Sequence, residues 1–123
     1  MIAYPDKTKG YVRVKSYGNL LNKNKEKSFN TLIAAHESTI SFLALNIEGT
    51  LLATASDKGT LIRIYSTETG DFLTELRRGT EKAEIYSICF NSASKFLACS
   101  SDRGTIHIFS LITVNEKLSK EQK

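Results

Sequence analysis

The sequence predicts an all-β fold, and three observations support this prediction. Residues 38–66 align with residues 83–110 at an offset of 45 with one single-residue gap, and eleven of the 28 aligned pairs are identical. Within both copies, short apolar runs are separated by tight Asp-x-Gly turns, which is typical of strands. A repeat of about 40 to 45 residues is the period of a WD-type β-propeller blade, which contains four short strands.

Each strand is predicted from a run of apolar residues that ends at a turn. No long helix is predicted, and the inner strands are expected to be apolar on both faces because neighbouring blades cover both sides. In the first copy we expect strands at residues 40–45, 51–56, 60–65 and 72–76, and in the second at 85–90, 96–100 and 105–111. Val12-Arg13-Val14 matches Ile62-Arg63-Ile64 and marks a third, partial copy.

The copies divide the chain into three units. Residues 1–36 are expected to form the end of one blade and a connecting loop, residues 37–80 a complete blade, and residues 81–123 an incomplete following blade that ends where its long loop starts. A closed propeller has roughly four to eight blades, so the sequence predicts a propeller fragment. Open blade faces and edge strands favour self-association of such a fragment.

Composition excludes several classes of protein. The longest apolar runs are far shorter than the roughly 20 residues of a membrane-spanning helix, and the N-terminus lacks a secretion signal, so the cytosol is the default compartment. Cys89 and Cys99 lie in apolar strands without metal-ligand spacing, so we expect packed thiols, no metal and no cofactor. The net charge is +4, yet residues 38–110 carry seven basic and eight acidic residues. The excess of basic residues in Asn22–Lys27 is interpreted as a solvated loop, not as a nucleic-acid site.

Catalysis is not expected. Neither histidine has a nucleophile or paired carboxylates around it, and no glycine-rich phosphate loop precedes a helix. His36 has two open interpretations. It either joins the blade entrance to Asp57 by hydrogen bonds, as a WD blade commonly does, or it contacts a ligand.

Arg77 and Arg78 are the most unusual feature. Consecutive side chains of a strand point to opposite faces, so these two arginines are expected to serve two separate sites. Arginine, lysine and hydroxyl groups suit phosphate, because arginine forms bidentate charge-assisted bonds and hydroxyls add neutral donors. From spacing alone, a solvated pair of arginines is the alternative.

Leu76-Arg77-Arg78-Gly79 resembles the Phe/Leu-Arg-Arg-Gly motif of the PROPPIN family. The stretches Ala35–Ser38, Ala53–Tyr65 and Cys99–Phe109 resemble that family as well, and the leucine variant with Ile85–Ile88 is most similar to its animal branch. The resemblance implies about two and a half of seven four-stranded blades. It also implies binding of phosphatidylinositol 3-phosphate and 3,5-bisphosphate, recruitment of autophagy machinery, and peripheral attachment to autophagosome precursor, endosomal or vacuolar membranes.

The resemblance also implies two headgroup pockets. The first would contain Arg77, His36, Ser56, Lys58, Thr60 and Arg63, and the second Arg78, Thr80, Lys82, Ser100, Ser101, Arg103, Thr105 and His107. A membrane-inserting loop would begin at residues 116–123, and contacts with autophagy proteins belong to blades outside this chain. The competing hypothesis is a generic WD-repeat scaffold in which both arginines bind acidic side chains of a protein.

Overall fold

The computed structural model describes residues 1–16 and 28–121, and ten strands and one helix lie in this part of the chain. The predicted loop at Asn22–Lys27 lies outside the described residues. The strands are β1 (Ile2–Pro5), β2 (Tyr11–Ser16), β3 (Phe29–Ala34), β4 (Ile40–Leu45), β5 (Leu51–Ser56), β6 (Leu61–Ser66), β7 (Phe72–Arg77), β8 (Ile85–Phe90), β9 (Phe96–Ser101) and β10 (Ile106–Ser110), and the helix is α1 (Ile112–Glu121).

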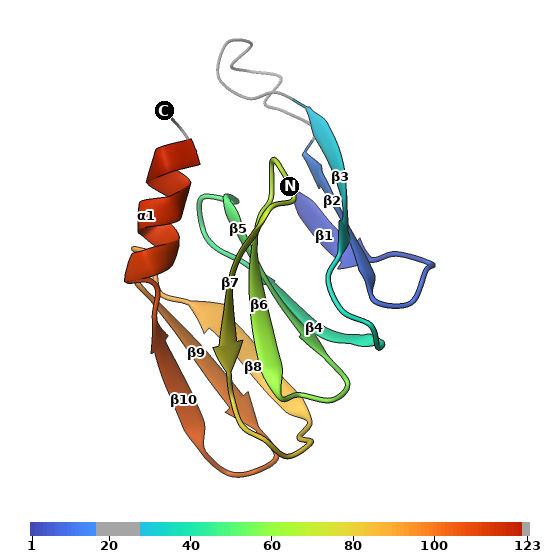
Figure 1. Cartoon of the computed structure of the whole chain (residues 1–123), viewed down its shortest axis with the longest axis vertical. Helices are drawn as coiled ribbons and strands as arrows, with labels where there is room; N and C mark the ends of the chain where they lie inside the picture. The colour runs from blue at the N-terminus through green and yellow to red at the C-terminus, as the bar shows by residue number, and fades with distance from the viewer. Residues whose placement is uncertain (17–27, 122–123) are drawn as a thin grey trace.

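The strands form three antiparallel sheets in which neighbours in sequence pair with each other. The first sheet has the order β1-β2-β3, the second β4-β5-β6-β7 and the third β8-β9-β10. Figure 1 shows the sheets side by side, with the second between the other two. The strands predicted from the repeat are all present, with bounds that differ by one residue at most. The all-β prediction is therefore confirmed.

Two apolar cores join the sheets. Leu52 and Tyr65 of the second sheet pack with Val12, Val14 and Ile33 of the first. The opposite face of the second sheet packs on the third through a larger cluster that includes Ala53, Ile62, Ile64, Ile88, Leu97 and Cys99. Every residue of β5 is buried, as expected for a strand that is covered on both faces. Burying one such leucine or isoleucine contributes about 1.5–3 kcal/mol.

A close backbone contact sets the position of the turn between β5 and β6. Gly59 has a φ of +68°, and a Cβ at this position would lie 1.9 Å from the carbonyl oxygen of Ala83. The N–H of Ala83 donates to the carbonyl of Lys58 at 3.0 Å. The turn thus interlocks with the connection from β7 to β8, and any side chain at Gly59 would push the two apart.

One element was not predicted, and one expectation is wrong. Residues 112–121 form a ten-residue helix, whereas we predicted only that no long helix is present and that a loop begins at residues 116–123. Leu111 and Val114 are buried in the core between the second and third sheets, and Lys117 Nζ donates to the carbonyl of Leu73, so packing stabilises the helix. Cys89 is exposed, not packed, because it lies on the uncovered face of the third sheet, whereas Cys99 is buried. The described residues contain no helix with the length and apolar character needed to cross a bilayer.

The uncovered face of the third sheet predicts self-association. Ile106 is 72% exposed and Ile108 is 70% exposed, and Phe96 and Tyr86 are also exposed large side chains. We expect the 123-residue chain to associate with increasing concentration, and the double change Ile106→Lys and Ile108→Lys to shift it toward monomer. Sedimentation velocity across a tenfold concentration range measures this. A wild-type chain that stays monomeric throughout would contradict the expectation.

Candidate functional site

Arg77 and Arg78 occupy different environments. Arg77 is the last residue of β7 and is exposed. Within the described residues its side chain makes no hydrogen bond or ion pair. Arg78 follows the strand and is 8% exposed. The register pairs Arg77 with Leu61, on the face of the second sheet that is turned to the first sheet, whereas Leu76 packs in the core toward the third. Strand alternation therefore directs the two arginines to two different junctions between sheets.

A polar row crosses the second sheet on the face of Arg77. Register places Thr54 of β5 opposite Arg63 of β6, and Arg63 opposite Glu75 of β7. Arg63 Nε lies 2.9 Å from Glu75 Oε1, and His36 Nε2 lies 2.9 Å from Thr54 Oγ1. Directly opposed side chains of antiparallel strands share a face, so the row is fixed by the register.

This row is attached to the first sheet through one carbonyl group. Arg63 donates to the carbonyl oxygen of Ala35 at 2.7 Å, and the Tyr65 hydroxyl donates to the same oxygen at 2.9 Å. Burial raises the pKa of Tyr65, so this hydroxyl stays a donor at neutral pH. The residue that follows Ala35 is His36, so these bonds also position the imidazole.

The structure bears on the first of the two interpretations of His36. Its ring nitrogen contacts the Thr54 hydroxyl, and the backbone N–H of Asp57 donates to the carbonyl of Thr39. The described residues show no hydrogen bond between His36 and Asp57, and contact of His36 with a ligand stays a prediction. Burial and the nearby Arg63 guanidinium lower the pKa of His36, while Glu75 acts in the opposite direction.

The lowered pKa of His36 predicts that stability falls in mild acid. Because the folded pKa lies below the ordinary value near 6.5, the unfolded chain binds more protons between the two values. The contribution of neutral His36 is complete above about pH 6.5 and is lost as the pH falls through the folded pKa. The urea midpoint of unfolding should fall from pH 7.5 to pH 5.5, and it should fall less for His36→Gln than for the wild type. His107→Gln is the matched control. A fall in the midpoint of His36→Gln as large as that of the wild type would contradict the argument.

The remaining residues predicted for the first pocket lie in or beside the turn between β5 and β6. Ser56 is buried, and its hydroxyl accepts the backbone N–H of Lys58 at 3.4 Å. The Lys58 side chain is exposed. The carbonyl of Thr60 accepts the backbone N–H groups of Arg78 and Gly79. The turn therefore contacts the connection that carries Arg78.

Arg78 joins two connections by its side chain. Its guanidinium donates to the carbonyl oxygens of Gly59 and Glu81. The Glu81 carboxylate in turn pairs with Arg103 at 3.0 Å, and Arg103 also donates to the carbonyl of Lys82. Glu81 thus holds Arg78 by its backbone and Arg103 by its side chain.

Further groups lie on the same side of the third sheet as the buried Cys99. His107 is the register partner of Cys99, and its ring nitrogen lies 3.3 Å from the Thr105 hydroxyl. Burial raises the pKa of the Cys99 thiol, and the charge of Arg78 partly offsets this, which indicates that the arginine lies nearby. Ser101 is buried and its hydroxyl accepts the N–H of Arg103.

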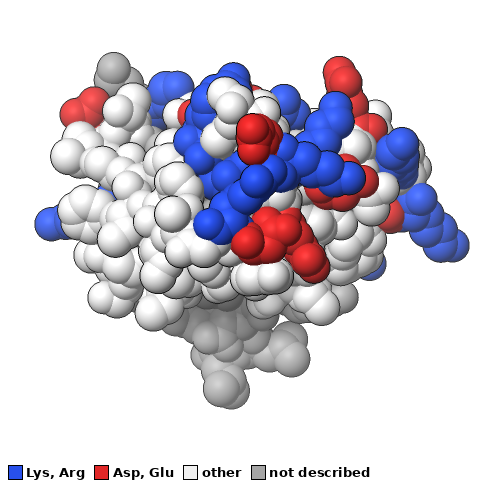
Figure 2. Space-filling view, turned by 90° about the horizontal axis from the view of Figure 1, so that it is seen from below, with Lys and Arg blue, Asp and Glu red and all other residues white. Residues whose placement is uncertain are grey.

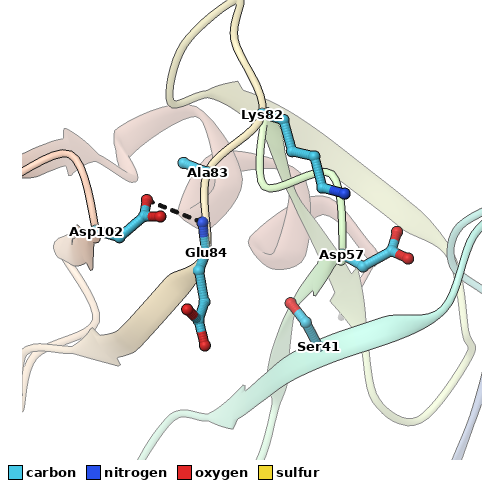
Figure 3. Close-up of a pocket in the computed structure, with 6 residues that line it drawn as sticks. All are labelled: Ser41, Asp57, Lys82, Ala83, Glu84 and Asp102. Carbon is cyan, nitrogen blue, oxygen red and sulfur yellow. Dashed lines mark hydrogen bonds between the residues drawn. The ribbon is translucent and has the colours of Figure 1, made fainter.

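Two of the predicted residues of the second pocket, Ser100 and Lys82, lie apart from this group. Ser100 is paired with Ser87 and Ile106, so it shares the outer face of the third sheet with exposed apolar residues. Thr80 is exposed on the connection after Arg78. Lys82 lines an open hollow of about 500 Å³ and points toward Asp57 across it (Figure 3). The other lining residues are Ser41, Ala83, Glu84 and Asp102, so carboxylates dominate this hollow.

Figure 2 shows the end of the molecule where these connections lie, with basic side chains gathered in a band beside acidic ones. Sequence reasoning missed Thr54, Glu75 and Glu81. Thr54 could have been found by aligning β5 with β6, because it lies opposite Arg63. Glu75 also lies opposite Arg63, but a bulge in the register between β6 and β7 hides this from the sequence. Glu81 carried no signal in the sequence.

The fold defines the class of protein. Three adjacent antiparallel sheets joined by apolar cores and interlocked turns form part of a β-propeller, and its junctions hold clusters of arginine, histidine and threonine. The PROPPIN family model matches residues 2–123. The chain belongs to the PROPPIN family.

Relatives and solved structures agree with this assignment. The chain is 52% identical over 79 residues to autophagy-related protein 18e of Arabidopsis thaliana, covering 64% of this chain and 21% of that protein. It is 46% identical over 113 residues to autophagy-related protein 18 of Caenorhabditis elegans, covering 90% and 26%. The crystal structure of Hsv2 from Kluyveromyces marxianus superposes with a TM-score of 0.77 at 27% identity and covers 89% of this chain and 34% of that one.

A further structural neighbour is a complex. A structure of KlAtg21 with the coiled coil of AgAtg16 superposes with a TM-score of 0.61 at 30% identity, covering 83% of this chain and 36% of that one. The chain spans about a fifth to a quarter of the length of the first two relatives and about a third of these solved chains.

Proposed function

We propose that this chain is the part of a PROPPIN that binds the headgroups of phosphatidylinositol 3-phosphate and 3,5-bisphosphate, and that the longer protein recruits autophagy machinery to membranes. The observation that carries the proposal is the division of Arg77 and Arg78 between two sheet junctions, each with a histidine bonded to a threonine. Arginine forms bidentate bonds to phosphate, and imidazole and hydroxyl groups supply further donors.

The first pocket is proposed to lie along the polar row. Arg77 is exposed and free within the described residues to bind phosphate, and Arg63 still has unused N–H donors after it binds Ala35 and Glu75. The residues proposed for this pocket are Arg77, His36, Ser56, Lys58, Thr60 and Arg63, with Thr54 and Glu75 added from the register.

The second pocket is proposed around Arg78 and the third sheet. Its members are Arg78, Thr80, Ser101, Arg103, Thr105 and His107, with Glu81 joining the two arginines. Ser100 faces away from this group, and Lys82 lines a hollow rich in carboxylates, so we assign neither of them to phosphate.

Vesicle flotation with matched charge tests the proposal. Vesicles contain phosphatidylinositol 3-phosphate, 3,5-bisphosphate or 4-phosphate in amounts that give equal net charge, at one fixed ionic strength. We expect the protein to be recovered with vesicles that contain either 3-phosphorylated lipid, and little of it with vesicles that contain the 4-phosphate. Equal recovery with all three would favour nonspecific charge attraction, and no recovery would favour the competing proposal of a protein scaffold.

A further inference from the structure

An ion pair within the proposed first pocket carries an inference about its selectivity. Glu75 Oε1 lies 2.9 Å from Arg63 Nε, and the side chains of Arg63 and Glu75 are 30% and 37% exposed. The pair is thus partly shielded and still open to a ligand. A phosphate that reaches Arg63 must lie close to a carboxylate, which repels it.

The geometry does not allow Glu75 to lie far from the other ligand groups. It is two residues before Arg77 on the same strand, so both side chains leave the same face of β7. Its charge also acts on His36 at the other end of the polar row, raising the pKa of the imidazole against the effect of burial. An anion bound between Arg77, Arg63 and His36 would lie within the same field.

A carboxylate at this position has one chemical use in a pocket for a phosphorylated sugar alcohol. An ionised carboxylate accepts hydrogen bonds and donates none, and it has about four acceptor positions, of which Arg63 Nε uses one. The oxygens of a fully ionised phosphate monoester are acceptors as well, whereas ring hydroxyl groups donate. The carboxylate therefore repels the phosphate and attracts a hydroxyl group beside it.

We propose that Glu75 is a specificity-determining residue of the first pocket, where its carboxylate accepts a hydrogen bond from an inositol ring hydroxyl and disfavours anions that lack such a hydroxyl. This inference rests on the proposed function, because it names the chemistry that separates an inositol phosphate from a simple anion without hydroxyl groups in the same pocket. It requires no rearrangement of Arg63, which keeps its bond to Ala35.

The test compares two ligands and two variants of the 123-residue chain. Inositol 1,3-bisphosphate and sulfate, a tetrahedral dianion without a hydroxyl group, are titrated separately at pH 7.5 and fixed ionic strength, and the amide resonances of Thr54 and Glu75 report binding at the first pocket. Glu75→Gln removes the charge and keeps an oxygen that can accept from Arg63. Glu68→Gln removes the same charge at an exposed position outside the pocket and is the matched control.

For the wild type we expect tighter binding of inositol 1,3-bisphosphate than of sulfate. In Glu75→Gln, binding of sulfate should strengthen about five- to tenfold while binding of the inositol bisphosphate changes less than twofold, so the ratio of the two affinities falls about fivefold. Glu75→Asp keeps the charge but shortens the side chain, and it should lose affinity for the inositol bisphosphate without gaining any for sulfate. Glu68→Gln should leave the ratio unchanged.

Two results would overturn the inference in different ways. If the wild type prefers the inositol bisphosphate and Glu75→Gln keeps the same ratio, Glu75 does not determine selectivity, although the proposed function stands. If the wild type shows no preference for the inositol bisphosphate, the proposed function and this inference fail together.

Discussion

Replacing both Arg77 and Arg78 with alanine is expected to abolish flotation of the chain with vesicles that carry phosphatidylinositol 3-phosphate. Each arginine supplies the bidentate group of one proposed pocket. Of the cations that remain, Arg63 and Arg103 are already paired with carboxylates and Lys58 is exposed, so we expect them not to hold a phosphate alone. The expected fall in recovery is from most of the protein to background. Arg13→Ala is the matched control, since Arg13 pairs with Asp6 on the outer face of the first sheet. Flotation of the double variant at the wild-type level would contradict both pockets.

The single variants should separate the two sites. Arg77→Ala should remove one of two headgroups counted by calorimetry and leave the other. Two weak sites on one body act together at a bilayer, so loss of one is expected to reduce vesicle affinity by about 10²- to 10⁴-fold while single-headgroup binding at the other persists. Arg77→Lys should also lose headgroup binding at the first pocket, because an ammonium group lacks the planar pair of donors that binds phosphate.

The strands could be predicted from the sequence because the repeat contains the same strand pattern in two copies. The two copies share Asn46 and Asn91, Gly59 and Gly104, and the apolar pairs between them, so turns and strands were placed by comparison within one chain. The structure explains the shared asparagines. The side-chain oxygen of Asn46 accepts the N–H groups of Thr50 and Leu51, and that of Asn91 accepts those of Lys95 and Phe96.

Helix α1 could not be predicted from local signals. Its first turn has no acidic residue, and it begins with Ile112, Thr113 and Val114, whose branched side chains favour strands. Burial of Leu111 and Val114 and the bond from Asn115 to the carbonyl of Ser94 stabilise it instead. These contacts join residues about 20 positions apart, so no window of sequence contains them.

The positions of the residues proposed for the pockets could be predicted only in part. Strand alternation was sufficient to assign Arg77 and Arg78 to different junctions. It was not sufficient for Glu75, because its contact with Arg63 depends on the register between β6 and β7, which includes a bulge. Ser100 and Ser101 were both assigned to the second pocket, although consecutive residues of β9 must face opposite ways.

Arg78→Ala is expected to destabilise the chain by about 2–4 kcal/mol, whereas Arg77→Ala should change stability by less than about 0.5 kcal/mol. Arg78 is 8% exposed and donates to the carbonyl oxygens of Gly59 and Glu81, so its removal takes a donor from the buried carbonyl of Gly59 and from the partly buried carbonyl of Glu81. Arg77 is exposed, and an exposed arginine without partners in the described residues contributes little.

Urea unfolding at pH 7.5 and at a protein concentration where the chain is monomeric measures both variants. Arg78→Lys should recover part of the loss, because an ammonium group can reach one carbonyl and not both. Adding a short inositol bisphosphate should raise the midpoint of Arg77→Ala less than that of the wild type, since one pocket is lost. If Arg78→Ala and Arg77→Ala unfold at the same urea concentration, Arg78 does not join the turn after β5 to the connection after β7. Its effect on membrane binding would then come from the loss of a phosphate contact alone.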